Sequence, residues 1–361
     1  MYLKSIAIAV FSTVLGASVG LAQTTAPATQ SKVFDFTNQP TPQGLQEIAT
    51  ILRTVGNIQQ LSVDPAAVTV TVTGTTDQLA MSGWIIHQLD QPIPADLSVP
   101  QPGASSSQQY LVAGKSDDVI QVFHLGTVIP SRPQMIQEIL TVLRTVVDVQ
   151  KVYNYTGLCD LVVRGPAAQL AFTQYLVSSL DVKPGSVTTS AEFQYQPQGE
   201  PATVARVFYL ASPSTPQHIQ EILTNLRTVV QIQKVFNYTA VNALAIRATP
   251  AELAASEFLI QSLDIPAAPN TGEAANIREF NMPATGKDGA SVIHVHYLAK
   301  ALTPQQIQEM LGVVRTVLGI QKTFNNSTPP ALTVRGSADQ VAKADQLIQQ
   351  ANKPLQTATA H

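Results

Sequence analysis

A glutamate and an arginine recur at fixed spacing four times along this sequence, which is otherwise poor in charged residues. Each glutamate precedes its arginine by six positions, and a second arginine follows twenty positions later in three copies, with Thr73 in the first. Carboxylate and guanidinium groups form charge-assisted hydrogen bonds, so these side chains can pair with each other or with a partner. The recurring residues are Glu47, Arg53, Glu138, Arg144, Arg164, Glu221, Arg227, Arg247, Glu309, Arg315 and Arg335.

Two interpretations of the repeated charges stay open. Six residues correspond to about 600° of helical turn, so the glutamate and arginine of one helix do not face each other. In the first interpretation they have a local structural role, with the arginine lying over the sheet and the glutamate solvated or capping. In the second, the glutamate of one helix meets an arginine such as Arg247 or Arg227 of a neighbouring module. We therefore treat all the recurring residues as candidate module-interface residues.

Other chemistry has little support in the sequence. We find no GxSxG, HExxH, phosphate-binding Gly-Lys-Ser/Thr or EF-hand pattern. The six histidines occupy no equivalent repeat position, and His294 and His296 share a face because they lie two apart on an expected strand. A metal site needs further ligands, and none is close in the sequence. We predict no catalytic residues, no metal site, no cofactor and no enzymatic activity.

The elements that position the recurring residues follow one pattern in each copy. In the third copy, residues 207–210 are typical of a strand, and Thr215 followed by proline indicates the start of an amphipathic helix. Two more strands are expected at 235–238 and 243–247, and Thr249 begins a capping box for a second helix. The fold class is therefore α+β, with four tandem βαββα modules.

The constant internal spacing places the insertions between modules. After each connector, an extended piece is expected to add a lead-in β-hairpin strand to copies two to four. We predict a signal peptide (1–22), module 1 (31–92), a linker (93–109), module 2 (110–184), a linker (185–192), module 3 (193–266), a linker (267–278), module 4 (279–354) and a tail (355–361).

The first residues are typical of a secretory signal peptide. Lys4 is followed by an apolar run of about ten residues and by small residues before Gln23. The alternative is a retained anchor, although the run is shorter than the roughly 20 residues that cross a bilayer. We expect cleavage, an exported protein in the periplasm or at the outer membrane, and no membrane span in the mature chain.

Bulk composition limits the class of partner. The formal net charge of −3 provides no basic field for nucleic acid, so nucleic-acid binding is not expected. Cys159 is the only cysteine and cannot form an intrachain disulfide. It is expected to be a small buried strand residue, with an intermolecular disulfide as the alternative.

The repeated pattern resembles the short N-terminal repeat domain of bacterial secretins, the NolW-like, ring-building domain with a KH-like βαββα fold. The resemblance lies in a strand such as 243–246, a capped turn, an amphipathic helix and a closing Leu-Asp-x-Pro. In copy one the strand and turn of this pattern are residues 70–75 and its closing segment is 89–92. In copy four they are residues 332–337 and Asn352-Lys353-Pro354. The chain departs from the family because no segment is expected to form the secretin pore domain.

The resemblance implies a non-enzymatic protein-interaction or scaffold protein of the cell envelope. Its expected partners are envelope proteins, with a second copy of the chain or a secretin as candidates. It would be accessory to a secretin, a type II secretion system or a type IV pilus-like assembly. The alternative is a periplasmic binding module for a small molecule or a cell-wall polymer, for which 6% aromatic residues is a sparse supply.

Overall fold

A computed structural model describes residues 28–93, 105–115, 117–127, 133–188, 190–197, 199–211, 215–265, 277–284, 289–298 and 302–352. The predicted signal peptide (1–22) and tail (355–361) lie outside the described residues. Within them, the chain forms four small antiparallel sheets and eight α-helices, a mixed α and β architecture. None of the described helices combines the length and apolar character that crossing a membrane requires.

Each sheet with its two helices is called a module below. Module 1 has the sheet order β1–β3–β2 and consists of β1 (Gln30–Asp35), α1 (Pro42–Thr54), β2 (Gln60–Asp64), β3 (Thr69–Gly74) and α2 (Thr76–Leu89). Module 2 consists of β4 (Ser105–Ser106), β5 (Tyr110–Leu111), β6 (Asp118–His124), α3 (Pro133–Val142) with a π-helical turn (Leu143–Val147), β7 (Lys151–Tyr155), β8 (Asp160–Pro166) and α4 (Ala167–Leu180). In its sheet, β4 and β5 both pair with β6, and the order continues through β8 to β7.

Modules 3 and 4 each have a four-stranded sheet. Module 3, with the order β11–β12–β10–β9, consists of β9 (Phe193–Tyr195), β10 (Thr203–Tyr209), α5 (Pro216–Asn225) with a π-helical turn (Leu226–Val230), β11 (Val235–Tyr238), β12 (Ala243–Ala248) and α6 (Pro250–Leu263). Module 4, with the order β13–β14–β16–β15, consists of β13 (Ile277–Met282), β14 (Ser291–Tyr297), α7 (Pro304–Thr316), β15 (Lys322–Ser327), β16 (Pro330–Gly336) and α8 (Ala338–Asn352).

Polar residues at the helix starts explain where the helices begin. The Thr249 side chain accepts a hydrogen bond from the backbone of Glu252, and the Glu252 carboxylate accepts one from Thr249 in return, which completes a capping box. Ser337 and Gln340 make the same pair of contacts before α8. Both capping boxes indicated by the sequence are therefore confirmed.

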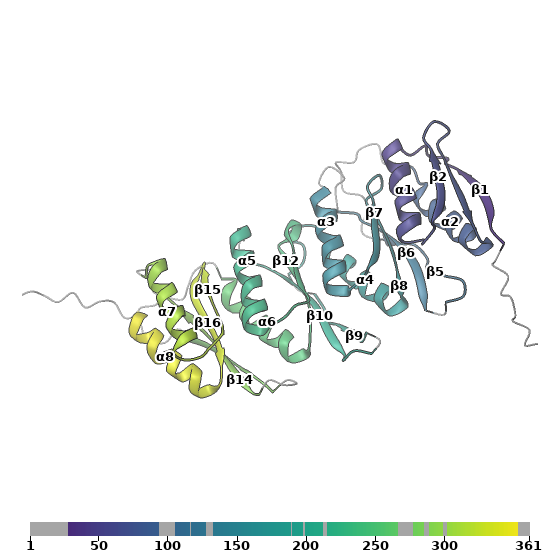
Figure 1. The fold of residues 1–361 in the computed structure, drawn as a ribbon. Coiled ribbons are helices and arrows are strands. Elements are labelled where there is room, and N and C mark those ends of the chain that lie inside the picture. The colour runs from purple at the N-terminus through teal and green to yellow at the C-terminus, as the bar shows by residue number, and fades with distance from the viewer. Residues whose placement is uncertain are drawn as a thin grey trace, which may run out of the picture.

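The four modules follow one another in a row, and their hydrophobic cores run across the junctions (Figure 1). The core of module 1 takes in Ile120, Val122 and Val162 from the sheet of module 2. In the same way, module 2 takes in Val207 of module 3, and module 3 takes in Ile293 of module 4. Each sheet of modules 2 to 4 is thus covered by its own helices on one face and by the preceding module on the other.

The sheet of module 1 differs because one of its faces is partly exposed. In β3, three half-buried threonines alternate with the buried Val70 and Val72. In contrast, every residue of β12 is buried. An antiparallel strand with one open face alternates in this way, whereas a strand covered on both faces is mostly apolar, as β12 is apart from Arg247.

The position of Cys159 differs from the expected one, which was a strand. The residue is buried, with 3% of its surface exposed, but it lies in the turn between β7 and β8 instead of in a strand. Its φ of 55° is in the left-handed region, which suits a turn residue and not a strand residue.

Candidate functional site

Three of the recurring glutamates reach across to the next module. Glu47 accepts hydrogen bonds from the backbone N–H of Thr156, at 2.8 Å, and from its hydroxyl, at 2.7 Å. Glu138 accepts the same pair from Thr239, both at 2.8 Å. Glu221 accepts the backbone N–H of Ser327 at 2.8 Å and its hydroxyl at 2.5 Å. One helix of each of the first three modules is therefore joined to the β-hairpin turn of the module that follows.

A glutamine one helical turn earlier holds each glutamate. Its side-chain amide donates to the carboxylate in all four modules, including the last. The pairs are Gln43–Glu47 at 3.1 Å, Gln134–Glu138 at 3.2 Å, Gln217–Glu221 at 3.1 Å and Gln305–Glu309 at 3.0 Å. Residues four apart on a helix are neighbours, so the glutamine restricts the rotamer of the glutamate before any partner binds.

The second arginine of the repeat points back to the preceding module. Arg164 donates to the carbonyl oxygens of Val55, at 2.9 Å, and Gly56, at 3.4 Å, at the end of the first helix of module 1. The same guanidinium binds Asp118 of its own module through two nitrogens, at 3.0 and 2.8 Å. A cation is favourable at a helix C-terminus, where the last carbonyls have no partner within the helix.

The other two junctions repeat this contact with small variations. Arg335 donates to the carbonyl oxygens of Val229, at 3.1 Å, and Val230, at 3.2 Å. Arg247 instead donates at 2.6 Å to the carboxylate of Asp148, the residue that ends the corresponding helix of module 2, and Lys234 pairs with the same carboxylate. In every junction the arginine thus binds the end of the helix that carries the bridging glutamate.

The first arginine of the repeat acts within its own module. Arg144, Arg227 and Arg315 each donate to a backbone carbonyl of the nearest strand, at 3.2, 3.2 and 3.1 Å. Arg53 is exposed. These residues fit the local structural interpretation, whereas the bridging glutamates and the second arginines lie at junctions. In the described residues, none of the three bridging glutamates contacts an arginine across a junction. Their partners there are threonine or serine.

A buried tyrosine accompanies two of the junctions. Tyr155, at the end of β7, is 2% exposed and packs in the core of module 1. Its ring lies so close to Gly44 of α1 that a Cβ there would come within 3.3 Å of the phenol oxygen. Burial raises the pKa of the Tyr155 hydroxyl to about 12, so it stays protonated at neutral pH. Tyr238 occupies the corresponding place in the core of module 2.

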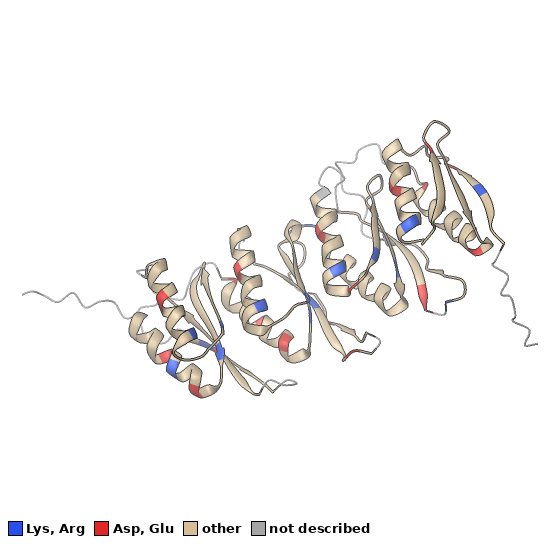
Figure 2. Ribbon diagram, in the orientation of Figure 1, with Lys and Arg blue, Asp and Glu red and all other residues tan. Residues whose placement is uncertain are grey.

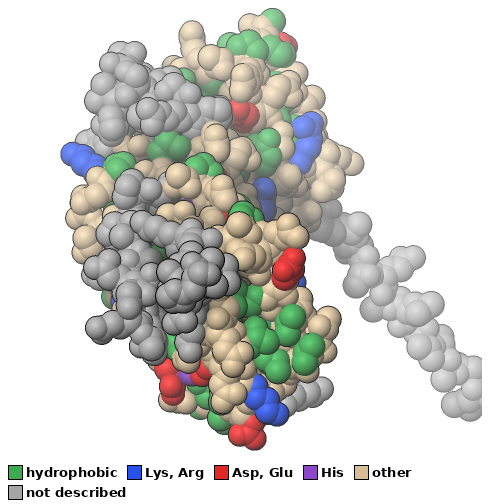
Figure 3. Space-filling view, turned by 90° about the vertical axis from the view of Figure 1, so that its left-hand side faces the viewer, with side chains coloured by type: hydrophobic (Ala, Val, Ile, Leu, Met, Phe, Trp, Pro, Cys, Tyr) green, Lys and Arg blue, Asp and Glu red, His purple; other side chains and the backbone are tan. Residues whose placement is uncertain are grey.

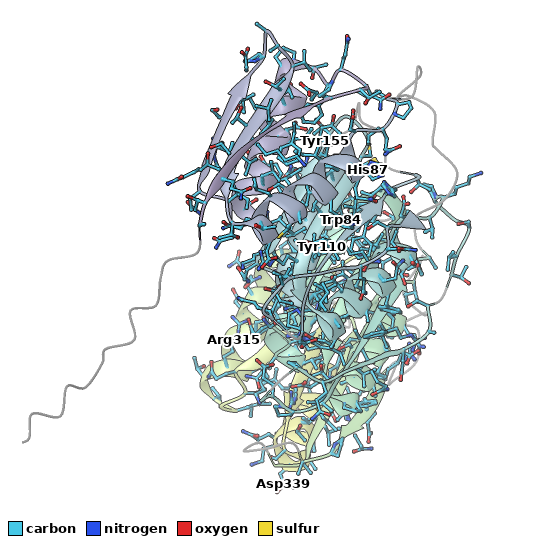
Figure 4. The ribbon with its side chains drawn as sticks, turned by 90° about the vertical axis from the view of Figure 1, so that its right-hand side faces the viewer. Trp84, His87, Tyr110, Tyr155, Arg315 and Asp339 are labelled. Carbon is cyan, nitrogen blue, oxygen red and sulfur yellow. The ribbon has the colours of Figure 1, made fainter. Side chains whose placement is uncertain are left out.

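Aromatic pairs make a second contact at each junction. Trp84 on α2 lies 5.3 Å from Tyr110 on β5, and Figure 4 shows these two side chains close together. The pairs Tyr175–Phe193 and Phe258–Phe280 repeat this contact at 5.1 and 5.4 Å. The first member of each pair comes from the second helix of a module, and the other from the lead-in strand of the next. Such pairs add about 0.5–1.5 kcal/mol beyond their buried area.

Histidines lie next to carboxylates at three places in the described chain, one of which is His218 at 3.8 Å from Asp264. His294 Nδ1 and His296 Nε2 lie 3.0 and 3.1 Å from the same oxygen of Asp345, and His294 Nε2 lies 3.3 Å from Glu279. Burial acts to raise the pKa of Asp345, but hydrogen bonds from His296 and His294 outweigh it and leave that pKa below its ordinary value. The three residues could supply ligand atoms within 4.8 Å of one another.

The second cluster pairs His124 with Asp160 at 2.7 Å. The hydrogen bond to Asp160 raises the pKa of His124 above its ordinary value. Burial raises the pKa of Asp160 to about 6, although the hydrogen bond to His124 acts to lower it. The pKa values of both groups are therefore above their ordinary values.

The sequence interpretation missed the hydroxyl partners of the glutamates. Thr156, Thr239 and Ser327 each lie eight positions before the second arginine of their module, so their recurrence could have indicated them. Figure 2 shows acidic and basic positions recurring on the first helices of successive modules, on a surface otherwise poor in charge. This arrangement can hold protein surfaces in fixed register.

No family model matches this chain, and no curated protein matches it. Among solved structures, the N-terminal domain of the secretin XcpQ from Pseudomonas aeruginosa is 17% identical, over 43% of this chain and 62% of that one, with a TM-score of 0.18. Aeromonas hydrophila ExeD is 18% identical, over 66% of this chain and 42% of that one, with a TM-score of 0.15.

The type II secretion system secretin GspD of E. coli K12 is 13% identical, over 86% of this chain and 59% of that one, with a TM-score of 0.15. This chain spans less than two thirds of the length of each of these three structures. Similarity at these TM-scores assigns neither a partner nor the role of any residue.

Proposed function

We propose that the protein is a non-enzymatic scaffold of the bacterial cell envelope. In this proposal it consists of four copies of one βαββα module, at residues 31–92, 110–184, 193–266 and 279–354, which dock end to end and offer their remaining surfaces to protein partners. The observation that carries the proposal is the junction itself. The same glutamate–hydroxyl and arginine–helix-end contacts occur at all three junctions.

Continuous cores make the row of modules suitable as a spacer. Each junction joins two cores, so bending it would expose apolar side chains such as Val122 and Val207, which are fully buried. Exposing apolar surface costs about 25 cal/mol per Å². A row of modules held in this way keeps its binding surfaces at fixed distances, as solenoid proteins do.

The role of the charged residues supports a binding function over a catalytic one. The bridging carboxylates and the second arginines make hydrogen bonds between modules, and the first arginines brace single modules. We therefore propose Glu47, Glu138, Glu221, Arg164, Arg247 and Arg335 as interface residues within the chain.

The proposed setting is the periplasm or the outer membrane, as an accessory of a secretin, a type II secretion system or a type IV pilus-like assembly. Two sequence features support it: the expected signal peptide and the fourfold resemblance to the secretin N-terminal repeat. Envelope proteins are the proposed partners.

Crosslinking in intact cells tests this proposal. The chain with a C-terminal tag is expressed in its native host, treated with a membrane-permeable crosslinker and purified, and its partners are identified by mass spectrometry. We expect subunits of one envelope machine in amounts close to that of the tagged chain. The control lacks residues 1–22 and should capture none of them. Recovery of the tagged chain with no stoichiometric envelope subunit would refute the scaffold proposal.

A further inference from the structure

Helix α7 of module 4 carries the docking face that holds the next module in modules 1 to 3. Two positions define this face, four and eight residues after the glutamate, and they are apolar in every module except for Asn225 in module 3. In the first three modules both are fully buried: Ile51 and Val55, Val142 and Val146, Asn225 and Val229 are all 0% exposed. In module 4, Val313 is 37% exposed and Val317 is 73% exposed. Within the described residues, nothing covers this face as the next module covers the others.

The polar part of the face is also present. Glu309 is exposed, whereas the three bridging glutamates are half-buried. Gln305 holds the Glu309 carboxylate at 3.0 Å, as Gln217 holds Glu221 at 3.1 Å. The Glu309 carboxylate is therefore already oriented to accept hydrogen bonds. No described residue donates the hydroxyl and backbone N–H that the bridging glutamates bind.

The end of α7 has the geometry of the other docking helices. Gly319 has a φ of 68°, and Gln231 at the corresponding place in module 3 has a φ of 75°. A left-handed residue is a common helix end. At the end of α7, the Leu318 carbonyl, which corresponds to that of Val230, accepts the side-chain amide of Gln340 at 3.2 Å. In module 3, the carbonyls of Val229 and Val230 bind Arg335.

Figure 3 looks at this end of the molecule. A group of hydrophobic side chains lies there between an acidic and a basic side chain. Val313 and Val317 are two of only four large apolar residues that are exposed in the described chain; Val313 lies in α7 and Val317 is the C-cap residue of that helix. Clustered exposed apolar residues with a polar rim are typical of protein-binding sites.

We propose that this face of α7 binds a β-hairpin in a domain of another protein, which presents Ser or Thr at the start of its turn and Arg eight residues later. This inference rests on the proposed scaffold function and names the partner's chemistry. The three internal junctions define that chemistry, because Thr156 with Arg164, Thr239 with Arg247 and Ser327 with Arg335 all have this spacing. The hydroxyl and N–H bind Glu309, and the guanidinium binds the end of α7.

A second copy of this chain does not fit as the occupant. The hairpin of module 1 has the same length as the others, since Asp64 pairs with Thr69 as Tyr155 pairs with Asp160. However, its turn begins with Pro65, which has neither an N–H nor a hydroxyl to donate. Thr73 replaces the arginine. The first module therefore lacks every polar group that the face requires.

The occupant also differs from the modules of this chain in one respect. Where α2, α4 and α6 carry an aromatic residue for the next lead-in strand, α8 carries the exposed Gln346. The partner is therefore expected to dock through its hairpin on α7, without an aromatic lead-in strand on α8.

The test uses the chain itself as the source of a hairpin. The probe is the chain without residues 1–22 and with the substitutions Pro65→Thr, Thr73→Arg and Glu309→Lys, which give module 1 the docking groups and remove the competing acceptor. Its binding to the otherwise unaltered chain is measured by sedimentation velocity and by calorimetry. Circular dichroism checks that the probe is folded.

We expect a one-to-one complex between the probe and the unaltered chain. Glu309→Lys in the unaltered chain should weaken the complex by about tenfold or more, because it removes the charged acceptor. Val317→Asp should weaken it similarly, because it places a charge in an apolar contact. Val33→Asp changes an exposed valine at the opposite end of the row and should leave the affinity unchanged.

Three results would overturn the inference. The first is a folded probe that does not bind, and the second is a complex that tolerates Glu309→Lys. The third is self-association of the unaltered chain that Glu309→Lys abolishes, since the occupant would then be a second copy. The crosslinking experiment in cells tests the scaffold function separately. A negative result with the probe would therefore refute the hairpin-binding face and leave the scaffold proposal untouched.

Discussion

Glu138 and Thr239 lie 101 residues apart in the sequence, yet the Glu138 carboxylate accepts both the backbone N–H and the hydroxyl of Thr239 at 2.8 Å. The contact joins α3 of module 2 to the hairpin turn of module 3. The same contact recurs at each junction, and Glu309 occupies the equivalent position without such a partner. Substitutions at these positions can therefore measure how much the contact stabilises the chain.

Glu138→Ala is expected to destabilise the chain by about 1.5–3 kcal/mol, because it leaves the Thr239 N–H without its charged acceptor. Urea denaturation followed by circular dichroism measures the change. The matched control is Glu309→Ala, which removes the equivalent exposed carboxylate and should stay within about 0.5 kcal/mol of the unaltered chain. Equal effects of the two substitutions would mean that the contact contributes nothing to the junction.

Arg164→Met should be more costly than the corresponding change in the first arginine. Arg164 is 6% exposed and binds Asp118 together with the Val55 carbonyl, so its removal leaves a half-buried carboxylate without its main partner. Breaking a buried pair costs about 3–5 kcal/mol. Arg144→Met removes one hydrogen bond to a backbone carbonyl and should cost about 1 kcal/mol. The reverse order in urea denaturation would show that Arg144 stabilises the chain more than Arg164 does.

Phe258→Leu should loosen the junction between modules 3 and 4. The substitution keeps an apolar side chain but removes the ring contact with Phe280, which contributes about 0.5–1.5 kcal/mol. Hydrogen–deuterium exchange at β13 should become faster by the corresponding factor. Gln346→Leu changes the equivalent residue of α8, and we expect no change in exchange there. Unaltered exchange at β13 in the Phe258 variant would exclude this contact as a stabilising one.

The His124–Asp160 pair predicts a stability that falls as the pH rises. Burial raises the pKa of Asp160 to about 6, so the folded state holds its proton more tightly than the unfolded state, and this contribution is lost between about pH 4 and 6. The hydrogen bond to Asp160 raises the pKa of His124 in the folded state. The contribution of His124 to stability is therefore complete below about pH 6.5 and is lost as the pH rises through its folded-state pKa.

Melting temperatures from pH 4 to 8 check this dependence. The double variant His124→Gln with Asp160→Asn has no titrating group at these positions, and its curve should be flatter over that range. Parallel curves for the variant and the unaltered chain would show that the pair does not control the pH dependence.

Cys159 is expected to be unreactive in the folded protein. Burial raises the pKa of its thiol to about 12, and the thiolate is the reactive form. A chromogenic disulfide reagent at pH 8 should label it only after unfolding in urea. Rapid labelling of the folded chain would support the alternative of an intermolecular disulfide.

Parts of the fold and of the site could be predicted because they depend on local pattern. The spacing of the apolar residues after Thr215 and the capping box at Thr249 specified helices that the structure contains. The alternation of threonine and valine in β3 was equally visible, and it matches the partly exposed face of module 1. The role of Arg144 within its own module was one of the two interpretations drawn from the charges.

Other features depend on contacts between distant segments. Asp345 meets His294 and His296 only because α8 lies on the sheet that contains β14. One of the two interpretations had arginine as the partner of Glu138, because opposite charges attract, but the docked hairpin places a threonine N–H and hydroxyl there. Attraction between charges has no direction, whereas hydrogen bonds to a backbone N–H require a fixed approach.

The sequence by itself determined the repeat, the α+β composition of each copy and the residues that recur in register, since spacing and periodicity act within a few turns of chain. Only the tertiary structure decided that the second arginine points back to the preceding helix, that the glutamate points forward to a hairpin, and that Val313 and Val317 are exposed. The physical reason is that burial depends on what packs against a surface. Ile51 and Val55 of module 1 are covered by the next module, whereas Val313 and Val317 at the equivalent positions of module 4 are exposed.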